Sequence, residues 1–293
     1  MKKIDVHAHT SMWSEAISGL KAPMASPQQL KKNYEELDIE KGFILPIVSP
    51  DCRGYVQSNE EMEYIATTHP ESFFWFCNVD PRMGDNTNQS DLSEIINYYK
   101  QRGAKGVGEV TANMYIDDPL MDNLFYHCSL CNMPVTIHLA PKKYGGYGIV
   151  DDLGLPKLEK LLKKYPNLKV LGHSQCFWSE IGDNVTEENR DGYVKGKVKE
   201  GAVVRLLRQY PNLYCDLSAT SGYNALSRDE DFAYRFIEEF GDRLLYGTDL
   251  YYPVQETFLA AWLDKSYENG CITKENYEKI CRENAIKLFN LSI

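Results

Sequence analysis

The strongest constraint on the fold is an alternation of apolar, strand-like runs with segments of helical periodicity along the whole chain. Several of these runs are apolar on both faces, as parallel strands covered by helices should be. Eight β–α units in 293 residues are typical of a single (β/α)8 barrel, the TIM-barrel form of the α/β class. The runs cover residues 4–9, 43–48, 73–79, 104–110, 135–140, 169–173, 213–218 and 244–249.

Capping residues and helix breakers support the same organisation. Ser26 and Pro27 form an N-cap and first turn, and we expect this helix to run to about Glu40. The last predicted helix, 273–289, follows the eighth strand and is expected to be an addition packed on the barrel. The sequence contains no proline-rich or serine-rich linker, so residues 1–293 are predicted to form one domain.

Charge and hydropathy restrict the partners and the compartment. The chain has 32 Lys and Arg against 42 Asp and Glu, a formal charge of −10, without a basic cluster. Nucleic acid and anionic membranes are therefore not expected as partners, because both are bound through Lys and Arg patches. The apolar runs are of strand length, and the start of the chain has no signal-peptide pattern, so we expect a cytoplasmic protein.

The eight cysteines occur singly within predicted strands and helices, which favours buried, reduced thiols over a disulfide framework. Cys128 and Cys131 form a Cys-x-x-Cys pair in a predicted helix just before a strand. A redox pair is one interpretation of this spacing. Helix packing is the favoured interpretation.

Polar residues gather where the predicted strands end. His7 and His9 alternate along the first strand and so share one of its faces. His138 ends the fifth strand, His173 the sixth and Asp249 the eighth. In a barrel these ends meet at the C-terminal rim, and imidazole with carboxylate is a ligand set that suits zinc. The sequence therefore predicts a divalent-metal site at this rim.

The other two histidines serve as internal controls. His69 lies at a predicted helix end before a proline, and His127 lies within a helix, so both are expected to be structural. If His138 or His173 is considered alone, the alternative to metal binding is a structural role, as a core histidine that is hydrogen-bonded to the backbone. It is disfavoured because four of six histidines fall at strand ends together with Asp249.

Five motifs carry a family resemblance: IDVHAH at 4–9, VTIH at 135–138, VLGHS at 170–174, YCDLS at 214–218 and LYGTD at 245–249. Together they resemble the amidohydrolase superfamily, and more narrowly its branch that contains aminocarboxymuconate-semialdehyde decarboxylase. The resemblance implies that a divalent metal, commonly zinc with manganese as an alternative, is bound by His7, His9, His138 and Asp249. It implies that His173 binds a second metal or acts directly on the substrate.

Glu109 ends the fourth strand, where some relatives with two metal ions place a bridging lysine or carboxylate. It is therefore a candidate further ligand, although a glutamate at this position can also be solvated or salt-bridged. Its role decides whether one or two ions are bound. Asp216 and Ser218, at the end of the seventh strand, are expected to orient a neighbouring ligand instead of touching the metal.

Residues on the rim loops are candidates for substrate contact. Arg53 could hold a substrate carboxylate through its planar guanidinium, or could be an ordinary surface arginine. Aromatic side chains on three loops would suit a small, partly planar or apolar substrate, or could pack within a lid. They are Trp13, Tyr144, Tyr147, Phe177 and Trp178.

Two reactions remain open. In the first, a water that the metal activates hydrolyses an amide, a lactone or another ester, Asp249 transfers the proton, and His173 helps to polarise the carbonyl. In the second, the same centre promotes nonoxidative decarboxylation of an unsaturated or aromatic acid. Both strand-one histidines are present, whereas some decarboxylases of this branch carry a glutamate at the first, so hydrolysis is favoured. The expected partner is a small-molecule substrate, and association into a homo-oligomer is a further expectation. A non-catalytic role as a binding or scaffold protein is disfavoured, because the set of expected metal ligands is complete.

Overall fold

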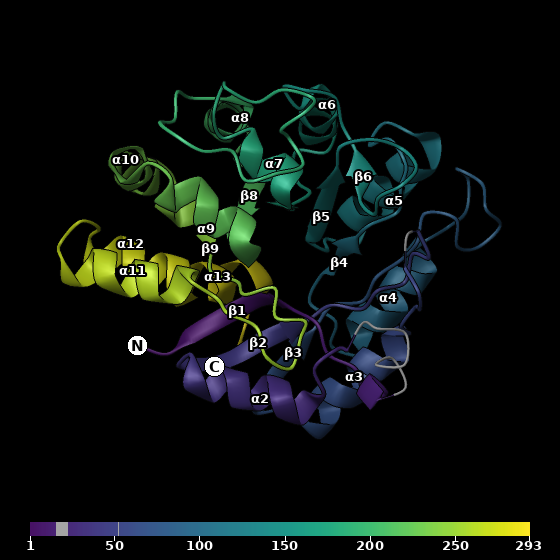
Figure 1. Cartoon of the computed structure of the whole chain (residues 1–293). Coiled ribbons are helices and arrows are strands. Elements are labelled where there is room, and N and C mark those ends of the chain that lie inside the picture. The colour runs from purple at the N-terminus through teal and green to yellow at the C-terminus, as the bar shows by residue number, and fades with distance from the viewer. Residues whose placement is uncertain (16–22, 52) are drawn as a thin grey trace.

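The computed structural model describes residues 1–15, 23–51 and 53–293, and it confirms the parallel α/β barrel (Figure 1). Two parallel sheets have the strand orders β1-β2-β3 and β4-β5-β7-β8-β9, and β6 pairs with β5 beside the rim. The strands are β1 (Lys3–Ala8), β2 (Ile39–Ile44), β3 (Phe73–Trp75), β4 (Val107–Val110), β5 (Val135–Ala140), β6 (Ile149–Val150), β7 (Val170–His173), β8 (Leu213–Asp216) and β9 (Leu244–Leu245).

Helices surround these strands on the outside, as Figure 1 shows. The predicted N-cap at Ser26 is present and forms part of a capping box: the Ser26 side chain accepts from the Gln29 N–H, and the Gln29 side chain accepts from the Ser26 N–H. The helices are α2 (Pro27–Glu36), α3 (Asn59–Thr68), α4 (Ser93–Gln101), α5 (Pro119–Leu130), α6 (Pro156–Lys164), α7 (Gln175–Ser179), α8 (Ala202–Gln209), α9 (Ala219–Ser227), α10 (Glu230–Phe240), α11 (Leu259–Glu268), α12 (Lys274–Glu278) and α13 (Asn284–Phe289).

Two seams join the sheets into a closed barrel. Between β3 and β4, Cys77 pairs with Val107, and the Lys105 N–H donates to the Trp75 carbonyl at 3.0 Å. Between the end of the chain's last strand and β1, Ala8 pairs with Leu250. Because closure removes the free edges of a sheet, backbone groups on both seams are paired within the protein.

The boundary between α2 and β2 was predicted wrongly. The helix ends at Glu36, four residues before the expected Glu40, and Asp38 turns the chain in the left-handed region at φ 54°. β2 then begins at Ile39 and includes two charged residues, Glu40 and Lys41, of which Glu40 was expected to end the helix. They are tolerated because Glu40 is exposed and the Lys41 ammonium lies 3.8 Å from the centre of the Phe74 ring.

A β-bulge in β1 determines which side chains of this strand face inward. Asp5 pairs with Gly42 and Ala8 with Ile44, so three residue steps on β1 match two on β2. Ile4 and Val6 pack with interior side chains of other strands, and beyond the bulge His7 and His9 also point into the barrel. The bulge therefore changes the alternation of the strand just before its end.

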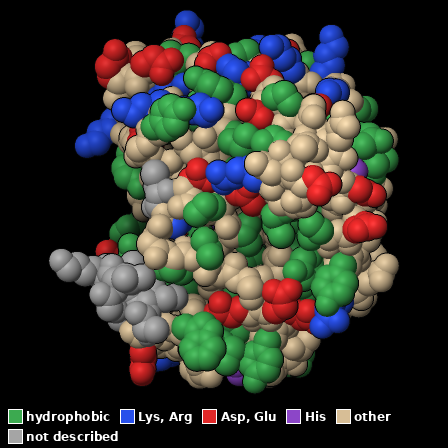
Figure 2. Space-filling model, turned by 90° about the vertical axis from the view of Figure 1, so that its right-hand side faces the viewer, with side chains coloured by type: hydrophobic (Ala, Val, Ile, Leu, Met, Phe, Trp, Pro, Cys, Tyr) green, Lys and Arg blue, Asp and Glu red, His purple; other side chains and the backbone are tan. Residues whose placement is uncertain are grey.

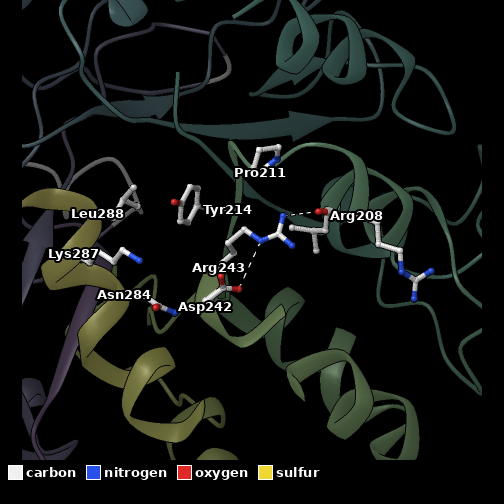
Figure 3. Close-up of a pocket in the computed structure, with 9 residues that line it drawn as sticks. Arg208, Pro211, Tyr214, Asp242, Arg243, Asn284, Lys287 and Leu288 are labelled. Carbon is white, nitrogen blue, oxygen red and sulfur yellow. Dashed lines mark hydrogen bonds and ion pairs between the residues drawn. The ribbon is translucent and has the colours of Figure 1, made fainter. Parts of the chain in front are cut away.

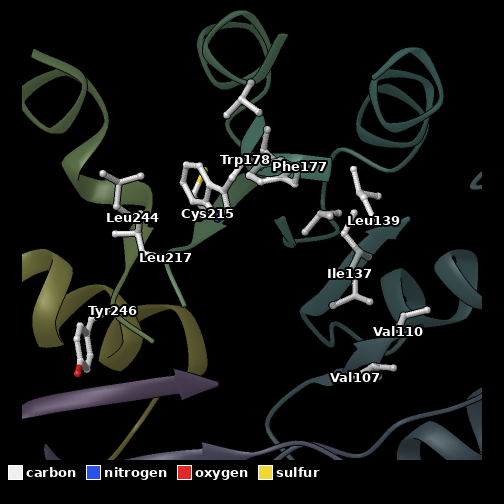
Figure 4. Packing of buried hydrophobic residues seen from close by; sticks show 14 of the residues in the cluster. Val107, Val110, Ile137, Leu139, Phe177, Trp178, Cys215, Leu217, Leu244 and Tyr246 are labelled. Atoms are coloured by element: carbon white, nitrogen blue, oxygen red, sulfur yellow. The ribbon is translucent and has the colours of Figure 1, made fainter. Parts of the chain in front are cut away.

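Hydrophobic packing occurs in two separate places. The larger cluster fills the space between the strands and the outer helices, where Figure 4 shows Ile137 and Leu139 of β5 near Phe177 and Trp178. The smaller cluster fills the barrel interior and is formed by side chains from several strands and from the C-terminal segment. Its buried members are Ile4, Val6, Phe43, Leu45, Phe76, Leu171, Leu245, Ala285, Phe289 and Leu291.

The C-terminal helical segment is therefore more than an addition to the outside. Phe289 is 4% exposed and lies with its ring centre 4.6 Å from Phe43 and 5.3 Å from Phe76. α12 and α13 are joined by a π-helical stretch, Lys279–Glu283, which contacts β1 and β9. This segment closes the amino-terminal end of the barrel, opposite the predicted metal site.

The predicted buried thiols are confirmed for six cysteines, and every cysteine that the structure describes is free. Cys271 is exposed, and Cys52 lies outside the described residues. Cys128 is fully buried, and burial raises the pKa of its thiol well above the usual value, which supports packing and not redox chemistry.

Within residues 1–15, 23–51 and 53–293, no helix has the length and apolar character needed to cross a bilayer. On the face shown in Figure 2, acidic and basic side chains are interspersed.

Replacing Phe289 with alanine should test the closure of the barrel base. We expect Phe289→Ala to lower the free energy of unfolding by about 3–5 kcal/mol, because it leaves a cavity in a closely packed aromatic cluster. Urea denaturation measures the change. Ile293→Ala is the control: this side chain is exposed, and its loss should cost less than about 0.5 kcal/mol. Equal effects of the two variants would contradict the assigned role of Phe289.

Candidate metal centre

The structure brings the strand-end residues together at the C-terminal rim of the barrel. The Nε2 atoms of His7 and His9 lie 3.2 Å apart. The Oδ1 atom of Asp249 is 3.5 Å from His9 Nε2 and 3.8 Å from His7 Nε2. His138, near the end of β5, pairs in register with His173, the last residue of β7, and their ring centres are 5.3 Å apart. The control residues lie elsewhere: His69 caps α3, and His127 of α5 bonds to Ser93.

Outer contacts fix the orientation of three imidazoles. His7 Nδ1 donates to Asp216 Oδ2 at 2.6 Å, and His9 Nδ1 donates to the Leu45 carbonyl at 2.9 Å. His173 Nδ1 pairs with the Ser218 hydroxyl at 3.0 Å. With Nδ1 engaged on the outside, each ring directs Nε2 to the centre, which is how proteins orient histidine ligands. The predicted orienting role of Asp216 and Ser218 is thus supported by these contacts.

The first group of donors fits a divalent ion. Around a tetrahedral zinc with bonds of roughly 2.0–2.2 Å, neighbouring ligand atoms are about 3.3–3.6 Å apart. The separations among His7 Nε2, His9 Nε2 and Asp249 Oδ1 run from 3.2 to 3.8 Å and bracket this range. These three residues can therefore hold an ion with little movement.

Glu109 stands between two pairs of histidines. Its Oε2 atom is 3.9 Å from Nε2 of both His7 and His9. Its Oε1 atom accepts a hydrogen bond from His138 Nδ1 at 2.6 Å and lies 3.6 Å from His173 Nε2. A second ion could be held by Glu109, His138 and His173 once the proton on His138 Nδ1 is displaced.

The ionisation of the site follows from its burial. Burial lowers the pKa of His9 and of His173 to about 3, so both rings are neutral and able to act as ligands. Burial opposes the charged form of His7 as well, but Asp216 outweighs it and raises the pKa of His7 to about 10. Without a metal, His7 thus carries a proton toward His9, and the position between the two Nε2 atoms favours positive charge.

The carboxylates differ in a similar way. Burial disfavours the charged form of Glu109, yet His138, His7 and His173 together hold its pKa well below the usual value. Burial raises the pKa of Asp249 to about 7, and the Glu109 carboxylate adds to this rise. The side chain of Asp249 is nevertheless 29% exposed, against 5% for Glu109. Asp249 is therefore more accessible to solvent than Glu109, and it is the acidic group of the centre that lies toward the opening of the barrel rim.

Two predicted substrate residues occupy different surroundings. The guanidinium carbon of Arg53 lies 3.7 Å from the centre of the Tyr147 ring, which in turn lies 4.5 Å from the His138 ring. Arg53 Nε is buried without a hydrogen-bond partner. Trp178, predicted to face the substrate, is instead 2% exposed in the barrel wall, where its N–H donates to the Asp216 carbonyl. Trp178 packs in the larger hydrophobic cluster and lines neither of the two small cavities beside the centre, so these contacts do not support the predicted role in substrate binding.

Two small cavities flank the centre. One of about 200 Å³ is lined by His138, Tyr147, Gln175 and Asp191, and another of about 190 Å³ is lined by Asp249 and Gln255 and shares Gln175. Phe177 is buried. Trp13 is 66% and Tyr144 80% exposed, and their contact with a substrate stays a prediction. Sequence reasoning did not single out Tyr55 and Tyr251, whose hydroxyls bond to each other beside His9.

A third cavity, of about 300 Å³, lies beside α8 and α13 (Figure 3). Its two arginines are already engaged within the protein. Arg243 donates to the carbonyls of Leu207 and Tyr210, and Arg208 pairs with Glu200 and Glu239. It contains none of the strand-end histidines and is separate from the metal centre.

Comparison with known proteins gives a family. The sequence profile described as amidohydrolase matches residues 4–291. No curated protein matches the chain significantly.

Three of the similar solved structures illustrate the range of matches. An amidohydrolase from Burkholderia multivorans with bound zinc has 13% sequence identity and a TM-score of 0.63, and the match covers 100% of both chains. A dihydroxybenzoic acid decarboxylase from Polaromonas sp. JS666, with bound manganese and the inhibitor 2-nitroresorcinol, has 15% identity and a TM-score of 0.60, and the match covers 99% of this chain and 97% of that one. A probable 2-pyrone-4,6-dicarboxylic acid hydrolase from Acinetobacter baumannii with citric acid bound has 15% identity and a TM-score of 0.59, and the match covers 99% of this chain and 100% of that one. At these identities the likeness shows the fold, and the profile match shows the family. The chain belongs to the amidohydrolase family of enzymes.

Proposed function

We propose that this protein is a metal-dependent hydrolase that cleaves an amide, lactone or other ester bond of a small organic molecule. The observation that carries the proposal is the placement of Glu109, with one carboxylate oxygen toward His7 and His9 and the other toward His138 and His173. Such an arrangement suits two ions bridged by one carboxylate. Paired-metal sites are widely used for hydrolysis.

The residues that would hold the first ion are His7, His9 and Asp249, with Glu109 shared between the ions and His138 and His173 completing the second position. Zinc is the expected metal, because imidazole and carboxylate are its common ligands, and manganese is the alternative. The structural relatives that contain zinc or manganese support this choice. When bound, such an ion polarises a carbonyl group and lowers the pKa of a water molecule.

The side chains of the protein would carry the proton transfers. Asp249 reaches the opening, lies 3.5 Å from His9 Nε2 and has its Oδ2 atom 3.9 Å from His173 Nε2. From this position its carboxylate can take a proton from the attacking water and return it to the leaving group. If only one ion is bound, the Nε2 atom of His173 is free of metal and would instead orient the substrate carbonyl. Buried Asp216 serves as an anchor for His7 and does not meet the substrate.

Arg53 would orient the substrate. Its guanidinium is held on the Tyr147 ring, and its buried Nε lacks a partner, so an oxygen anion of the substrate would satisfy it. This supports a substrate that carries a carboxylate besides the bond that is cleaved. The relative described as a hydrolase of a pyrone dicarboxylic acid has a substrate of this kind, since a 2-pyrone is a cyclic ester.

Decarboxylation is the second candidate. It is favoured by the likeness to a dihydroxybenzoic acid decarboxylase and by the aromatic ring of Tyr147 beside His138. In this reaction Asp249 would deliver the proton that replaces carbon dioxide.

We further propose that the protein works in the cytoplasm, because its described cysteines are free thiols. The partner is a small-molecule substrate, with no role for nucleic acid or membrane. Association into a homo-oligomer stays a prediction.

Purified enzyme should lose turnover when its metal is removed. We expect one or two equivalents of zinc or manganese by elemental analysis, loss of activity after dialysis against a chelator, and recovery when the metal is returned. Assays on lactones, amides and unsaturated carboxylic acids identify the reaction: hydrolysis products without carbon dioxide support the proposal, whereas carbon dioxide release supports the alternative. Full activity without metal would overturn both.

His7→Ala should abolish metal binding at the first position while the barrel stays folded. The loss should exceed the roughly 10–100-fold weakening caused by removing an outer partner of a ligand, because His7 is predicted to be a ligand itself. Zinc titration and circular dichroism measure the two effects. His69→Ala, a histidine at the end of α3, is the matched control and should keep full metal content.

Glu109→Gln should reduce the metal content from two equivalents to one. An amide cannot supply the second anionic oxygen that a bridge between two cations needs. Elemental analysis of the folded variant gives the count. Glu180→Gln changes a glutamate that is 2% exposed but lies outside the centre, and it should leave the count unchanged. Two tightly bound ions in Glu109→Gln would exclude the bridge.

A further inference from the structure

Asp5 is completely buried two residues before the first predicted ligand, and its contacts lie on the seam that closes the barrel. Its Oδ1 atom accepts from the N–H groups of His7 and Thr248, at 3.0 and 2.9 Å. Its Oδ2 atom accepts from the Thr248 hydroxyl at 2.6 Å. One carboxylate therefore joins the backbone of a residue on β1 to the residue just before Asp249.

Thr248 extends this contact across Asp249. While its hydroxyl donates to Asp5, the same oxygen accepts from the Leu250 N–H at 3.1 Å. Asp249, which lies between Thr248 and Leu250, is held by two more hydrogen bonds. Its N–H donates to the His7 carbonyl at 2.8 Å, and its carbonyl accepts from Gln255 Nε2 at 2.8 Å. The chain is thus fixed on both sides of Asp249.

The backbone of Asp249 needs such fixing. Its φ is 55°, in the left-handed region that residues other than glycine seldom adopt and that costs about 1–3 kcal/mol unless the surroundings hold it. In this conformation its carboxylate meets the Nε2 atoms of His7 and His9. Relaxation of the backbone into a right-handed or extended form would turn the side chain away from the histidines.

We propose that Asp5 is a positioning residue of the metal centre, acting through Thr248 to hold Asp249 in the left-handed conformation that aims its carboxylate at His7 and His9. The inference rests on the proposed function in so far as these three residues bind the metal. Asp5 itself does not touch the centre. Because it bonds to the backbone of both His7 and Thr248, it also sets the separation between the two ligand-bearing segments.

A purely structural role for Asp5 would have different consequences. Loss of its bonds would then lower stability, but the protein that remains folded would bind metal as before, with Asp249 unchanged. The zinc affinity of the folded protein and the backbone conformation of Asp249 therefore separate the two roles.

Thr248→Val removes the hydroxyl while keeping the shape of the side chain. We expect its zinc dissociation constant, measured by competition with a chelator, to rise at least about tenfold, in line with the loss of an outer partner of a ligand. In a crystal structure of the metal-free variant, φ of Asp249 should leave the left-handed region. Thr248→Ser keeps the hydroxyl and should restore both properties.

Thr136→Val is the matched control. Thr136 is also a buried threonine close to a predicted ligand, two residues before His138, but its hydroxyl has no hydrogen-bond partner. The same isosteric change there should leave zinc affinity and the Asp249 conformation unaltered. Should Thr248→Val fail to fold, Asp5→Asn replaces one of the two accepting oxygens by an NH2 group, so that the side chain can no longer accept from both the Thr248 hydroxyl and the two backbone N–H groups, and the same two effects are expected.

Unchanged zinc affinity and an unchanged Asp249 conformation in the folded variant would overturn the inference. If the wild-type protein binds no zinc or manganese, the proposed function fails, and the crystallographic comparison of Asp249 still decides the positioning role. The two failures are thus distinguishable.

Discussion

Closure of the barrel between its last strand and β1 is the contact on which the site depends. The seam joins segments more than two hundred residues apart: His9 N–H donates to the Leu250 carbonyl at 2.8 Å, and Asp249 N–H donates to the His7 carbonyl at 2.8 Å. Three predicted ligands therefore lie on one seam, and they meet only when the whole chain has folded. Because a ligand that binds only the folded state stabilises it, a metal held here would also stabilise the closed barrel.

The interior of the barrel is divided between two environments. Toward its base, Phe43, Phe76 and Phe289 fill the space without polar atoms, whereas toward the rim imidazoles and carboxylates gather. Glu109 and Asp216 are buried acids whose charge must be balanced, since an unpaired charge in a low-dielectric interior is costly. Protonated histidine or a metal cation can supply the balance. The same surroundings that make the charges costly strengthen their attraction for a cation.

The barrel and the main residues of the centre could be predicted from the sequence, because strand periodicity and strand ends are local features. Other properties depend on register and orientation, which local patterns do not contain. The bulge that turns His7 and His9 inward arises from the pairing of β1 with β2. The Leu45 carbonyl that orients His9 has no sequence signal at all. The bond from the Trp178 ring to the Asp216 carbonyl likewise depends on how α7 packs against β8 and has no local signal.

The position of Arg53 bears on the choice between the two reactions. A carboxylate that pairs with this guanidinium is stabilised in its charged form, and the cost of removing it as carbon dioxide rises, because the pairing favours the ground state over the transition state. Arg53 is held on Tyr147 and is not part of the group of strand-end ligands. A substrate anchored there would keep its carboxylate and present another bond to Asp249. This pairing supports the proposed hydrolysis of a carboxylate-bearing substrate, whose own carboxylate would stay in place.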